Sequence, residues 1–421
     1  MIVGKIWDSE FPWDVRVEKV CDTLTAAGHE VHLVCRNRRR EPVLESRPSV
    51  TIHRLAPLHG LLSRWDAALS FPAFVNPRWY RFVRHTFAAC RADVILCRDL
   101  PLAPLALAVG RALKRPVMLD ISEHYPGMLA DLYNARDFRV ANLLVRNPVF
   151  ARWLERLVLP RAAGVLVVVE EMAERLVSLG VPRGRITVVS NTPRADRASM
   201  MAAVPRLRRD AGQPLRMVYL GNIEYSRGLD VVIEAVARLA AEGVMVRFDV
   251  YGDGKGAPAE RRRAQRLGVA DRVIFHGHQP YDEVLAQLPR FDAGIIPHHA
   301  IAQCSFTVPN KLFDCMAAGL PVIVSSMPPS ARITESAGAG LVFRDRDPED
   351  LARIVRTFPV GEAAVRMGEA GRRAVAEQYT WDRDAERLVA AVERAAGSAP
   401  ASGLKEPRAA QEGAGSAEAL L

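Results

Sequence analysis

Residues 305–322 read Ser-Phe-Thr-Val-Pro-Asn-Lys-Leu-Phe-Asp-Cys-Met-Ala-Ala-Gly-Leu-Pro-Val, an order that predicts a loop, a short helix, a tight stop and a buried strand. Pro309 suits the first turn of a helix, where the N–H group that proline lacks would have no partner anyway. Gly319 suits the position just after a helix, where φ is often positive. Pro321 then prevents the helix from continuing, and the β-branched run at 322–324 indicates a strand.

One edge of the predicted helix carries three different polar groups. Asn310, Lys311 and Asp314 lie together at offsets of one and four residues, whereas Leu312, Phe313, Met316 and Ala317 form an apolar face. Free N–H groups in the first turn and the Lys311 ammonium suit a phosphate, and the Asp314 carboxylate can accept hydrogen bonds from sugar hydroxyls. An ordinary amphipathic helix with a solvated polar edge explains the same pattern.

The motif Pro-Asn-Lys-Leu-Phe-Asp, followed by Met-Ala-Ala-Gly-Leu-Pro-Val, resembles the donor-site segment of glycosyltransferase family 4. The usual signature of that family is Glu-x7-Glu; here Asp314 stands at the second position and Phe306 at the first. The chain is similar to the branch that carries Pro-Asn-Lys before the helix. The resemblance implies an α/β protein with the GT-B fold, in which two Rossmann-like doubly wound domains face each other across a cleft. It also implies a retaining, metal-independent hexosyltransferase that uses nucleotide sugars.

A second segment resembles the same family. Gly221-Asn222 to Arg227-Gly228 follows a predicted strand at 216–220 and is similar to the family's Gly-Arg…Lys-Gly loop, with Asn222 in place of Arg and Arg227 in place of Lys. A guanidinium binds two oxygens at once, so Arg227 is the strongest candidate for a pyrophosphate contact, although it also suits a solvated loop. The expected donor-site residues are Gly221, Asn222, Arg227, Gly252, Ser305, Phe306, Thr307, Asn310, Lys311 and Asp314.

Polar residues also follow a predicted strand in the first half of the chain. Ser122, Glu123 and His124 come directly after the buried run 116–121, and ligands in open α/β sheets bind at the carboxyl ends of strands. The cluster resembles the family's Asp-x-His-Glu, which implies a place on the acceptor side. Arg16, in the first strand–helix unit, is a further acceptor-side candidate for an anion contact, or an ordinary surface arginine. The catalytic candidates are Glu123, His124, Arg227 and Lys311.

Composition is that of an ordinary globular protein. Of the 421 residues, 49% are hydrophobic and 25% are charged, and no apolar run reaches the length of about 18 residues that spans a bilayer. The first residues read as a core strand rather than a signal peptide, because no apolar segment follows. Six cysteines lack paired-ligand spacing, which favours reduced thiols in the cytoplasm and no metal site. The net charge of +9 invites anionic partners, but no nucleic-acid motif is present.

Strand and helix patterns alternate along the chain, which predicts parallel sheets covered on both faces. We expect an acceptor-binding Rossmann-like domain at 1–192, a linker at 193–213 and a nucleotide-sugar-binding Rossmann-like domain at 214–379. A last helix at 380–396 should cross back to the first domain, and a tail at 397–421 has little to bury and should be disordered. Residues 36–90 read as irregular, basic and aromatic.

Two basic, aromatic stretches suit an anionic membrane surface. In residues 58–84, Trp, Tyr and Phe side chains alternate with arginines, and residues 139–159 read as one long amphipathic helix with several arginines. Helices packed against the domain explain the first stretch equally well.

The sequence therefore predicts a glycosyltransferase that moves a sugar from a nucleotide sugar to a sugar or a lipid-linked acceptor, in cell-surface polysaccharide or glycolipid assembly. We expect a nucleotide sugar as the donor substrate. We expect no cofactor and no metal. A cytoplasmic protein, peripheral on the inner membrane face, fits this interpretation. Two alternatives remain: a nucleotide-sugar epimerase on the same fold, and a non-catalytic partner subunit. The substitutions at positions 222 and 306 favour the second alternative, whereas Arg227, Lys311 and Asp314 argue against it.

Overall fold

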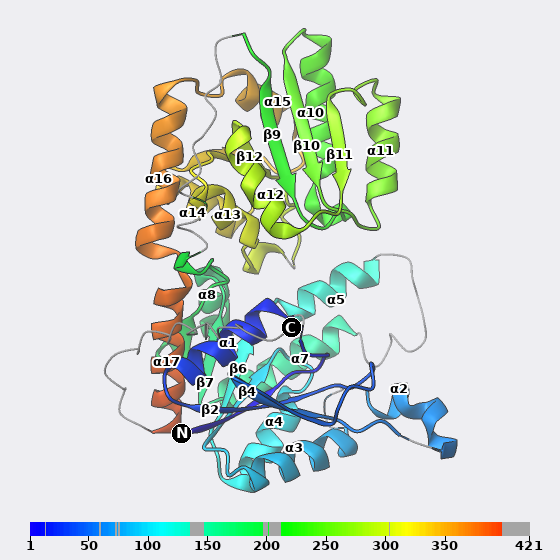
Figure 1. The fold of residues 1–421 in the computed structure, drawn as a ribbon, viewed down its shortest axis with the longest axis vertical. Coiled ribbons are helices and arrows are strands. Elements are labelled where there is room, and N and C mark those ends of the chain that lie inside the picture. Colours follow the sequence, from blue (N-terminus) through cyan, green and yellow to red (C-terminus); the bar gives the residue numbers. More distant parts are fainter. Residues whose placement is uncertain are drawn as a thin grey trace, which may run out of the picture.

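The computed structural model describes residues 1–12, 14–58, 60–71, 74, 76–134, 147–196, 201, 212–302 and 304–397. The described strands form two separate sheets, each covered by helices on both sides (Figure 1). We call the sheet of residues 2–188 with its helices the first domain, and the sheet of residues 215–343 with its helices the second domain. Most of the expected linker at 193–213 and almost all of the expected tail at 397–421 lie outside the described residues.

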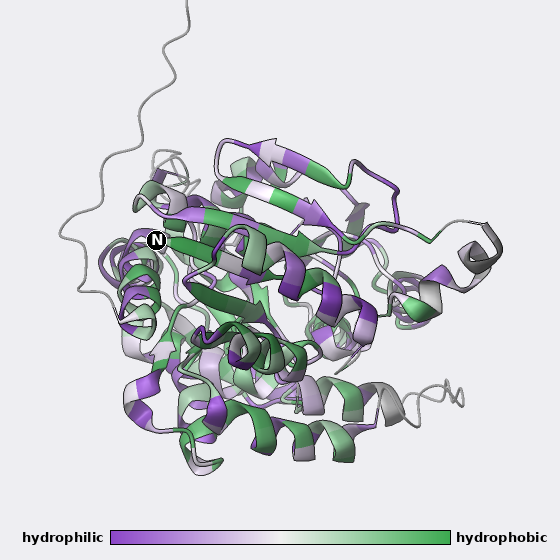
Figure 2. Cartoon of the chain, turned by 90° about the horizontal axis from the view of Figure 1, so that it is seen from below, coloured by the Kyte–Doolittle hydropathy of each residue, from purple (hydrophilic) through white to green (hydrophobic). Residues whose placement is uncertain are grey.

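Eight of the described strands form the first sheet, in the order β3-β4-β2-β1-β5-β6-β7-β8. Neighbouring strands run parallel except in the β3–β4 hairpin. The strands are β1 (Ile2–Ile6), β2 (Glu30–Cys35), β3 (Leu44–Arg47), β4 (Val50–Arg54), β5 (Val94–Arg98), β6 (Val117–Ile121), β7 (Gly164–Val167) and β8 (Ile186–Val188). In the view from below, the central strands are mostly hydrophobic, and hydrophilic segments lie along the outer strands and helices (Figure 2).

The described helices of the first domain are α1 (Val15–Ala26), α2 (Asp66–Leu69), α3 (Pro77–Ala89), α4 (Ala103–Leu113), α5 (Tyr125–Asn134), α7 (Pro148–Val158) and α8 (Glu170–Ser178), with 3-10 turns at Gly60–Trp65, Leu159–Arg161 and Arg183–Arg185. The expectation that residues 36–90 are irregular is wrong, because they contain the β3–β4 hairpin and α3. Trp79, Val83 and Phe87 are spaced by four residues and form one buried face of α3. The aromatic residues on this face of α3 therefore pack into the core, whereas Trp65 and Phe71 before the helix are exposed. Of the helix expected at 139–159, residues 139–146 lie outside the described residues.

The second sheet has the strand order β11-β10-β9-β12-β13-β14, and all its neighbouring strands are parallel. Its strands are β9 (Leu215–Leu220), β10 (Val246–Tyr251), β11 (Val273–Gly277), β12 (Ala293–Ile296), β13 (Val322–Ser325) and β14 (Gly340–Phe343). Strand order reverses between β9 and β12. In doubly wound sheets, ligands bind beyond the carboxyl ends of the strands at this reversal, so the loops that follow β9 and β12 are the expected binding loops.

Helices of the second domain are α10 (Leu229–Ala241), α11 (Ala257–Arg266), α12 (Tyr281–Gln287), α13 (Asn310–Ala317), α14 (Pro328–Ala337), α15 (Pro348–Arg356) and α16 (Glu362–Gln378), with 3-10 turns at Tyr225–Arg227, Leu288–Arg290 and Cys304–Phe306. The helix α13 and the strand β13 confirm the elements predicted from residues 309–324. Pro309 is the residue that caps α13, and Gly319 has a φ of 67° just beyond its end. A side chain at Gly294 of β12 would collide with Cys315, so α13 packs closely on the sheet.

The last described helix, α17 (Trp381–Ala396), packs against the first domain although it follows the second (Figure 1). The indole of Trp381 donates a hydrogen bond of 2.8 Å to Thr23 Oγ1 of α1, and the hydroxyl of Thr192 donates one of 2.6 Å to Asp384. These buried contacts anchor α17 on the first domain, as expected for the crossing helix. Within the described part of the chain, no helix combines the length and the apolar character needed to cross a bilayer.

Candidate active site

Glycines let the loops after β9 and β10 touch backbone to backbone. Gly252 has a φ of 137°, and a side chain there would lie 2.0 Å from the main-chain oxygen of Gly221. The N–H of Gly221 donates to the oxygen of Tyr251 at 2.8 Å, which holds the two loops together. The loop after β9 is therefore fixed at the reversal point of the sheet.

Lys311, in the first turn of α13, reaches this loop. Its ammonium nitrogen lies 3.8 Å from the centre of the Tyr219 ring and 3.1 Å from the position that a Cβ of Gly221 would occupy. The absence of a side chain at Gly221 therefore leaves room for the ammonium, and the Tyr219 ring supports its charge from one side. Residues from positions 219, 221 and 311 thus meet at one point.

Arg227 lies close enough to Lys311 for the two cations to repel each other. Burial lowers the pKa of the Lys311 ammonium well below its usual range, and the Arg227 guanidinium lowers it further. Within the described chain, neither side chain forms an ion pair or a hydrogen bond, although both are half-buried. Two neighbouring cations without a counter-ion are costly unless an anion joins them, so the loop after β9 and the start of α13 form a candidate anion site.

Asp314, one turn further along α13, is 3% exposed and accepts a hydrogen bond from the hydroxyl of Tyr281 at the start of α12. The carboxylate also acts across the two domains, because it raises the pKa of Lys19 of α1, which burial lowers to about 8 overall. Its environment is thus polar although it is buried, and it shares α13 with Lys311 of the anion site.

His298 and His299, which follow β12 at the reversal point, belong to the site but were absent from the sequence predictions. His298 is 2% exposed, and its Nε2 has no hydrogen-bond partner among the described residues. Burial lowers its pKa well below the usual value, and Lys311 and Arg227 lower it further. His299 lies 3.0 Å from Asp345 and 3.4 Å from Asp230, and these carboxylates raise its pKa against the effect of burial. Ligands in open α/β sheets bind at the carboxyl ends of strands, and this rule, which selected His124, applies to both histidines as well.

His124 links the two domains. Its Nδ1 lies 2.9 Å from the main-chain oxygen of Ala302, and its ring meets the Phe306 ring edge-on at 4.8 Å between centres. Arg175 of α8 lies over the same Phe306 ring and is held by a bidentate ion pair with Glu155. His124, which follows β6, therefore lies against the segment before α13. This contact is expected when the carboxyl ends of the strands in the two sheets face each other.

Comparison with known protein families matches both halves of the chain. Residues 214–358 match the family described as "Glycosyl transferases group 1", and residues 14–192 match the "Glycosyl transferase 4-like domain". The chain thus matches glycosyl transferase families over both of its halves. The GT-B fold expected from the sequence is thereby confirmed: two Rossmann-like domains with parallel sheets, facing each other.

Two relatives of this glycosyl transferase illustrate the range of the family. The 2-deoxystreptamine glucosyltransferase of Streptomyces kanamyceticus is 28% identical over 254 residues, which cover 58% of this chain and 64% of the relative. The putative colanic acid biosynthesis glycosyltransferase WcaL of Salmonella typhimurium is 27% identical over 187 residues, which cover 44% of this chain and 45% of WcaL. The similarity thus spans about half to two thirds of these relatives. Among solved structures, Anabaena HepE in complex with UDP and glucose has a TM-score of 0.64 at 13% identity, covering 92% of this chain and 98% of HepE.

Arg16 of this glycosyl transferase does not present its charge to the interdomain face. It is 4% exposed, and its guanidinium donates to Asp120, to the main-chain oxygen of Val189 and to Asn191. Arg16 and Lys5 lower the pKa of Asp120 to about 2, although burial alone would raise it. The geometry contradicts an anion contact at Arg16, because its donors are already shared among partners inside the first domain. Its role is to join α1 to β6.

The other predicted residues are more peripheral in the glycosyl transferase. Ser122 is buried and donates through its hydroxyl to Asp99, whereas Glu123 is exposed. The hydroxyl of Ser305 donates to the oxygen of Ile301, and the N–H of Thr307 donates to the oxygen of Cys304, so both residues shape the turn before α13. The Asn222 amide donates to Glu224, and Asn310 is exposed at the start of α13.

Proposed function

We propose that this protein transfers a hexose from a nucleotide sugar to a sugar or lipid-linked acceptor, with retention of the anomeric configuration and without a metal ion. The observation that carries the proposal is the pair of cations, Arg227 and Lys311, without a counter-ion at the reversal point of the second sheet. The UDP and glucose in the HepE complex and the biosynthetic activities named for the relatives support a nucleotide-sugar donor. A place in polysaccharide or glycolipid assembly is part of the same proposal.

Arg227 and Lys311 would hold the two phosphates of the donor. When the bond from the anomeric carbon to the phosphate oxygen breaks, negative charge develops on the departing nucleoside diphosphate. Cations that are fixed before the reaction stabilise this charge without reorganisation. They provide the charge that a divalent metal would otherwise supply, which is our reason for proposing metal independence. Retention is proposed from the family resemblance alone.

Asp314 would accept hydrogen bonds from the ribose hydroxyls. In the described structure it already accepts one from Tyr281, so the ribose would share or replace this bond. Asp314 is near enough to Lys19 of the first domain to raise the pKa of that ammonium, so the nucleoside end of the donor would face the first domain. The site thus offers cations for the diphosphate and a carboxylate for the sugar hydroxyls.

His124 would orient the reacting sugar or the acceptor rather than bind the diphosphate. Burial lowers the pKa of its imidazole, which favours the neutral ring. The Ala302 oxygen can only accept, so the neutral ring donates through Nδ1 and leaves Nε2 as an acceptor. An acceptor nitrogen at the interdomain face suits a sugar hydroxyl.

The two alternatives make different demands on this site. An epimerase needs acid and base groups around the sugar but no acceptor, and a non-catalytic subunit needs no ordered anion site. The pairing of Arg227 with Lys311 argues against a non-catalytic subunit, and the named activities of the relatives favour transfer over epimerisation. The six free cysteines fit a reducing compartment, so we propose that the protein works in the cytoplasm.

The test is nucleotide binding followed by transfer. UDP, GDP and ADP are screened by thermal shift with and without EDTA, because a ligand at 100 times its Kd stabilises by about 2.7 kcal/mol. The stabilising nucleotide then identifies the sugar donors, whose hydrolysis and transfer are followed by nucleotide release. We expect one nucleotide to stabilise equally with and without EDTA. Stabilisation by none of them would contradict the anion site, activity that requires Mn²⁺ would contradict metal independence, and interconversion of nucleotide sugars would indicate the epimerase.

A further inference from the structure

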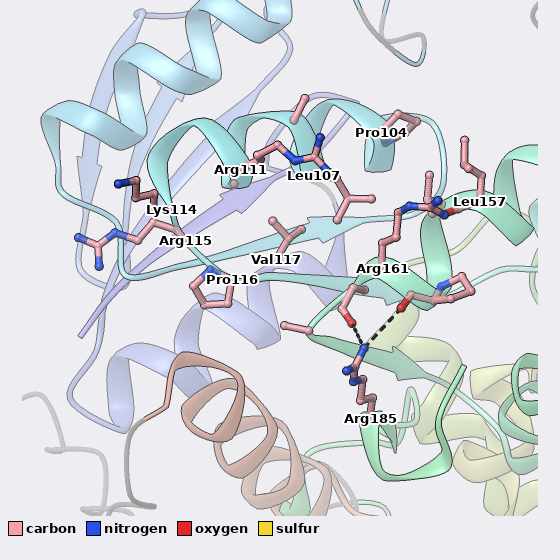
Figure 3. Close-up of a pocket in the computed structure, with 16 residues that line it drawn as sticks. Pro104, Leu107, Arg111, Lys114, Arg115, Pro116, Val117, Leu157, Arg161 and Arg185 are labelled. Atoms are coloured by element: carbon pink, nitrogen blue, oxygen red, sulfur yellow. Dashed lines mark hydrogen bonds between the residues drawn. The ribbon is translucent and has the colours of Figure 1, made fainter. Parts of the chain in front are cut away.

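A large groove lies at the end of the first sheet that is opposite to His124. It has a volume of about 1010 Å³ and runs between α4, the start of β6 and the 3-10 turn after α7 (Figure 3). Its lining includes Pro116 and Val117, where β6 begins, and Ala162 and Ala163, which precede β7. It is therefore formed at the amino ends of the strands, whereas the candidate active site lies beyond their carboxyl ends.

The groove combines an apolar floor with a basic rim. Leu107, Val117 and Val158 are among the apolar lining residues, and the basic lining residues are Arg111, Lys114, Arg115, Arg161 and Arg185. None of the described lining residues is acidic. In the described structure, Arg185 donates only to the main-chain oxygens of Pro160 and Ala162, so its charge is not neutralised.

The remaining rim charges are also largely uncompensated. Within the described chain, Arg111 and Lys114 have no ion-pair partner, and both side chains are exposed. Arg161 donates to the main-chain oxygen of Leu157. Arg115 lies 3.7 Å from the exposed Asp93 carboxylate, a pair that contributes little in water. The rim therefore presents several positive charges to whatever occupies the groove.

An exposed apolar stripe on α7 leads into this groove. Val149, Trp153 and Leu157 are spaced by four residues, are 62%, 56% and 36% exposed, and lie on one face of the helix. Leu157 is also a lining residue of the groove. The exposed Arg152 and Arg156 flank the stripe. A helix surface with large apolar side chains between arginines is typical of helices that lie in a membrane interface.

The side chains of the stripe are supported by packing within the first domain. Phe150 stacks on Trp153 at 5.6 Å between ring centres, and Phe74 meets Phe150 edge-on at 4.8 Å. Ala151, Leu154 and Val158 on the opposite face of α7 are buried. The exposed side chains are thus held in place by the core and are displayed at one surface with the groove.

We propose that the stripe of α7 and the basic groove form one membrane-docking surface, in which the groove binds the phosphate headgroup of an anionic phospholipid and the stripe enters the interface. Charge complementarity selects the anionic lipid, and the apolar floor beside the stripe accommodates the start of its acyl chains. A soluble phosphate compound would use the basic rim but would leave the floor and the stripe in water. The docking surface is separate from the active site and does not depend on the proposed sugar transfer.

Vesicle flotation tests the proposal on the full chain. Vesicles of phosphatidylcholine with and without phosphatidylglycerol are compared, and we expect binding only to the anionic ones. Binding should disappear at about 1 M salt, where the Debye length is about 3 Å. The double variant Arg111→Gln, Lys114→Gln should bind roughly 30-fold more weakly, the effect expected for two basic residues at an anionic surface. The matched control Arg262→Gln, Arg266→Gln removes two exposed charges from α11 of the second domain and should bind as the wild type does.

A second variant separates the stripe from charge alone. Trp153→Ser should weaken binding without changing its salt dependence, and the indole fluorescence of the wild type should shift to the blue on anionic vesicles. Nucleotide-induced thermal shifts should be equal in all variants, which distinguishes a lost membrane surface from a damaged active site. Equal binding by the groove variant and its control would overturn the proposal. So would competition by glycerol phosphate without vesicle binding, or a stable dimer in solution that Trp153→Ser dissociates.

Discussion

His124 Nδ1 of the first domain lies 2.9 Å from the main-chain oxygen of Ala302 in the second domain. One hydrogen bond therefore joins the strand end of β6 to the segment before α13, which carries Lys311 and Asp314. Because the carbonyl oxygen accepts, the neutral imidazole keeps its Nε2 free of a proton, and burial favours this neutral form by lowering the pKa. The contact fixes both the position of the ring and the direction of its acceptor.

The first prediction concerns this ring. His124→Ala should slow sugar transfer by roughly 10²-fold, the cost of losing the alignment of a reacting group, while the Kd for the nucleotide diphosphate changes little. Steady-state transfer rates and calorimetric binding of the nucleotide measure the two effects separately. His85→Ala removes an exposed histidine of α3 and serves as the control. Loss of nucleotide binding in a folded His124→Ala protein would move His124 to the donor side.

The second prediction uses the buried, neutral His298. Its pKa is lowered in the folded protein, so between that value and about 6.5 the unfolded chain binds a proton that the folded chain does not. Stability therefore falls as the pH drops below about 6.5, by at most about 1.4 kcal/mol per pH unit for one proton. His298→Gln removes this contribution, and its thermal midpoint should fall less steeply between about pH 7 and pH 5. Identical slopes for variant and wild type would mean that folding does not lower the pKa of His298.

The third prediction compares two glycines with positive φ. Gly268 has a φ of 69° and open space around it, so Gly268→Ala should cost about 1–2 kcal/mol from backbone strain alone. Gly252→Ala adds a collision with the backbone of Gly221 and should cost more. Since Gly221 adjoins the Lys311 ammonium, Gly252→Ala should also weaken nucleotide binding, whereas Gly268→Ala should not. Denaturation and nucleotide titration of both variants measure this, and equal binding would mean that the two loops are not coupled.

Local signals in the sequence predicted most of the elements. Pro309 and Gly319 mark the ends of α13 because capping depends only on neighbouring residues, and the β-branched run at 322–324 lies in β13. The segment 36–90 was misread, because its many arginines and aromatics hide the four-residue spacing of Trp79, Val83 and Phe87. Their burial depends on the sheet that α3 covers.

The sequence placed candidate residues at the right strand ends but could not give their partners. Arg16 and Asp120 are 104 residues apart, and nothing in the pattern around either indicates that they form a buried ion pair. The hydrogen bond from Tyr281 to Asp314 likewise depends on how α12 meets α13. His298 illustrates a different limit, because it follows the carboxyl end of β12, but no motif in the sequence singles it out.

The last prediction tests the two cations directly. Arg227 comes from the loop after β9 and Lys311 from α13, so each approaches the diphosphate from a different element. Both should stabilise the charge of the leaving group more than the bound donor, and Lys311→Ala or Arg227→Ala should lower kcat by roughly 10²–10³-fold. Asp314→Ala should instead raise the donor KM, because its hydroxyl contacts are equal in the ground state and the transition state.

Single variants, the double variant and Arg262→Ala as a control are assayed for transfer in the presence of EDTA. Since the two cations repel each other, removing Arg227 raises the pKa of Lys311, and the remaining cation compensates for part of each single loss. The double variant should therefore lose more activity than the product of the two single losses. Multiplicative losses would mean that the cations act at separate points of the donor. A double variant with wild-type kcat would remove the diphosphate from this site altogether, and the two unpaired charges would then need another anion to explain them.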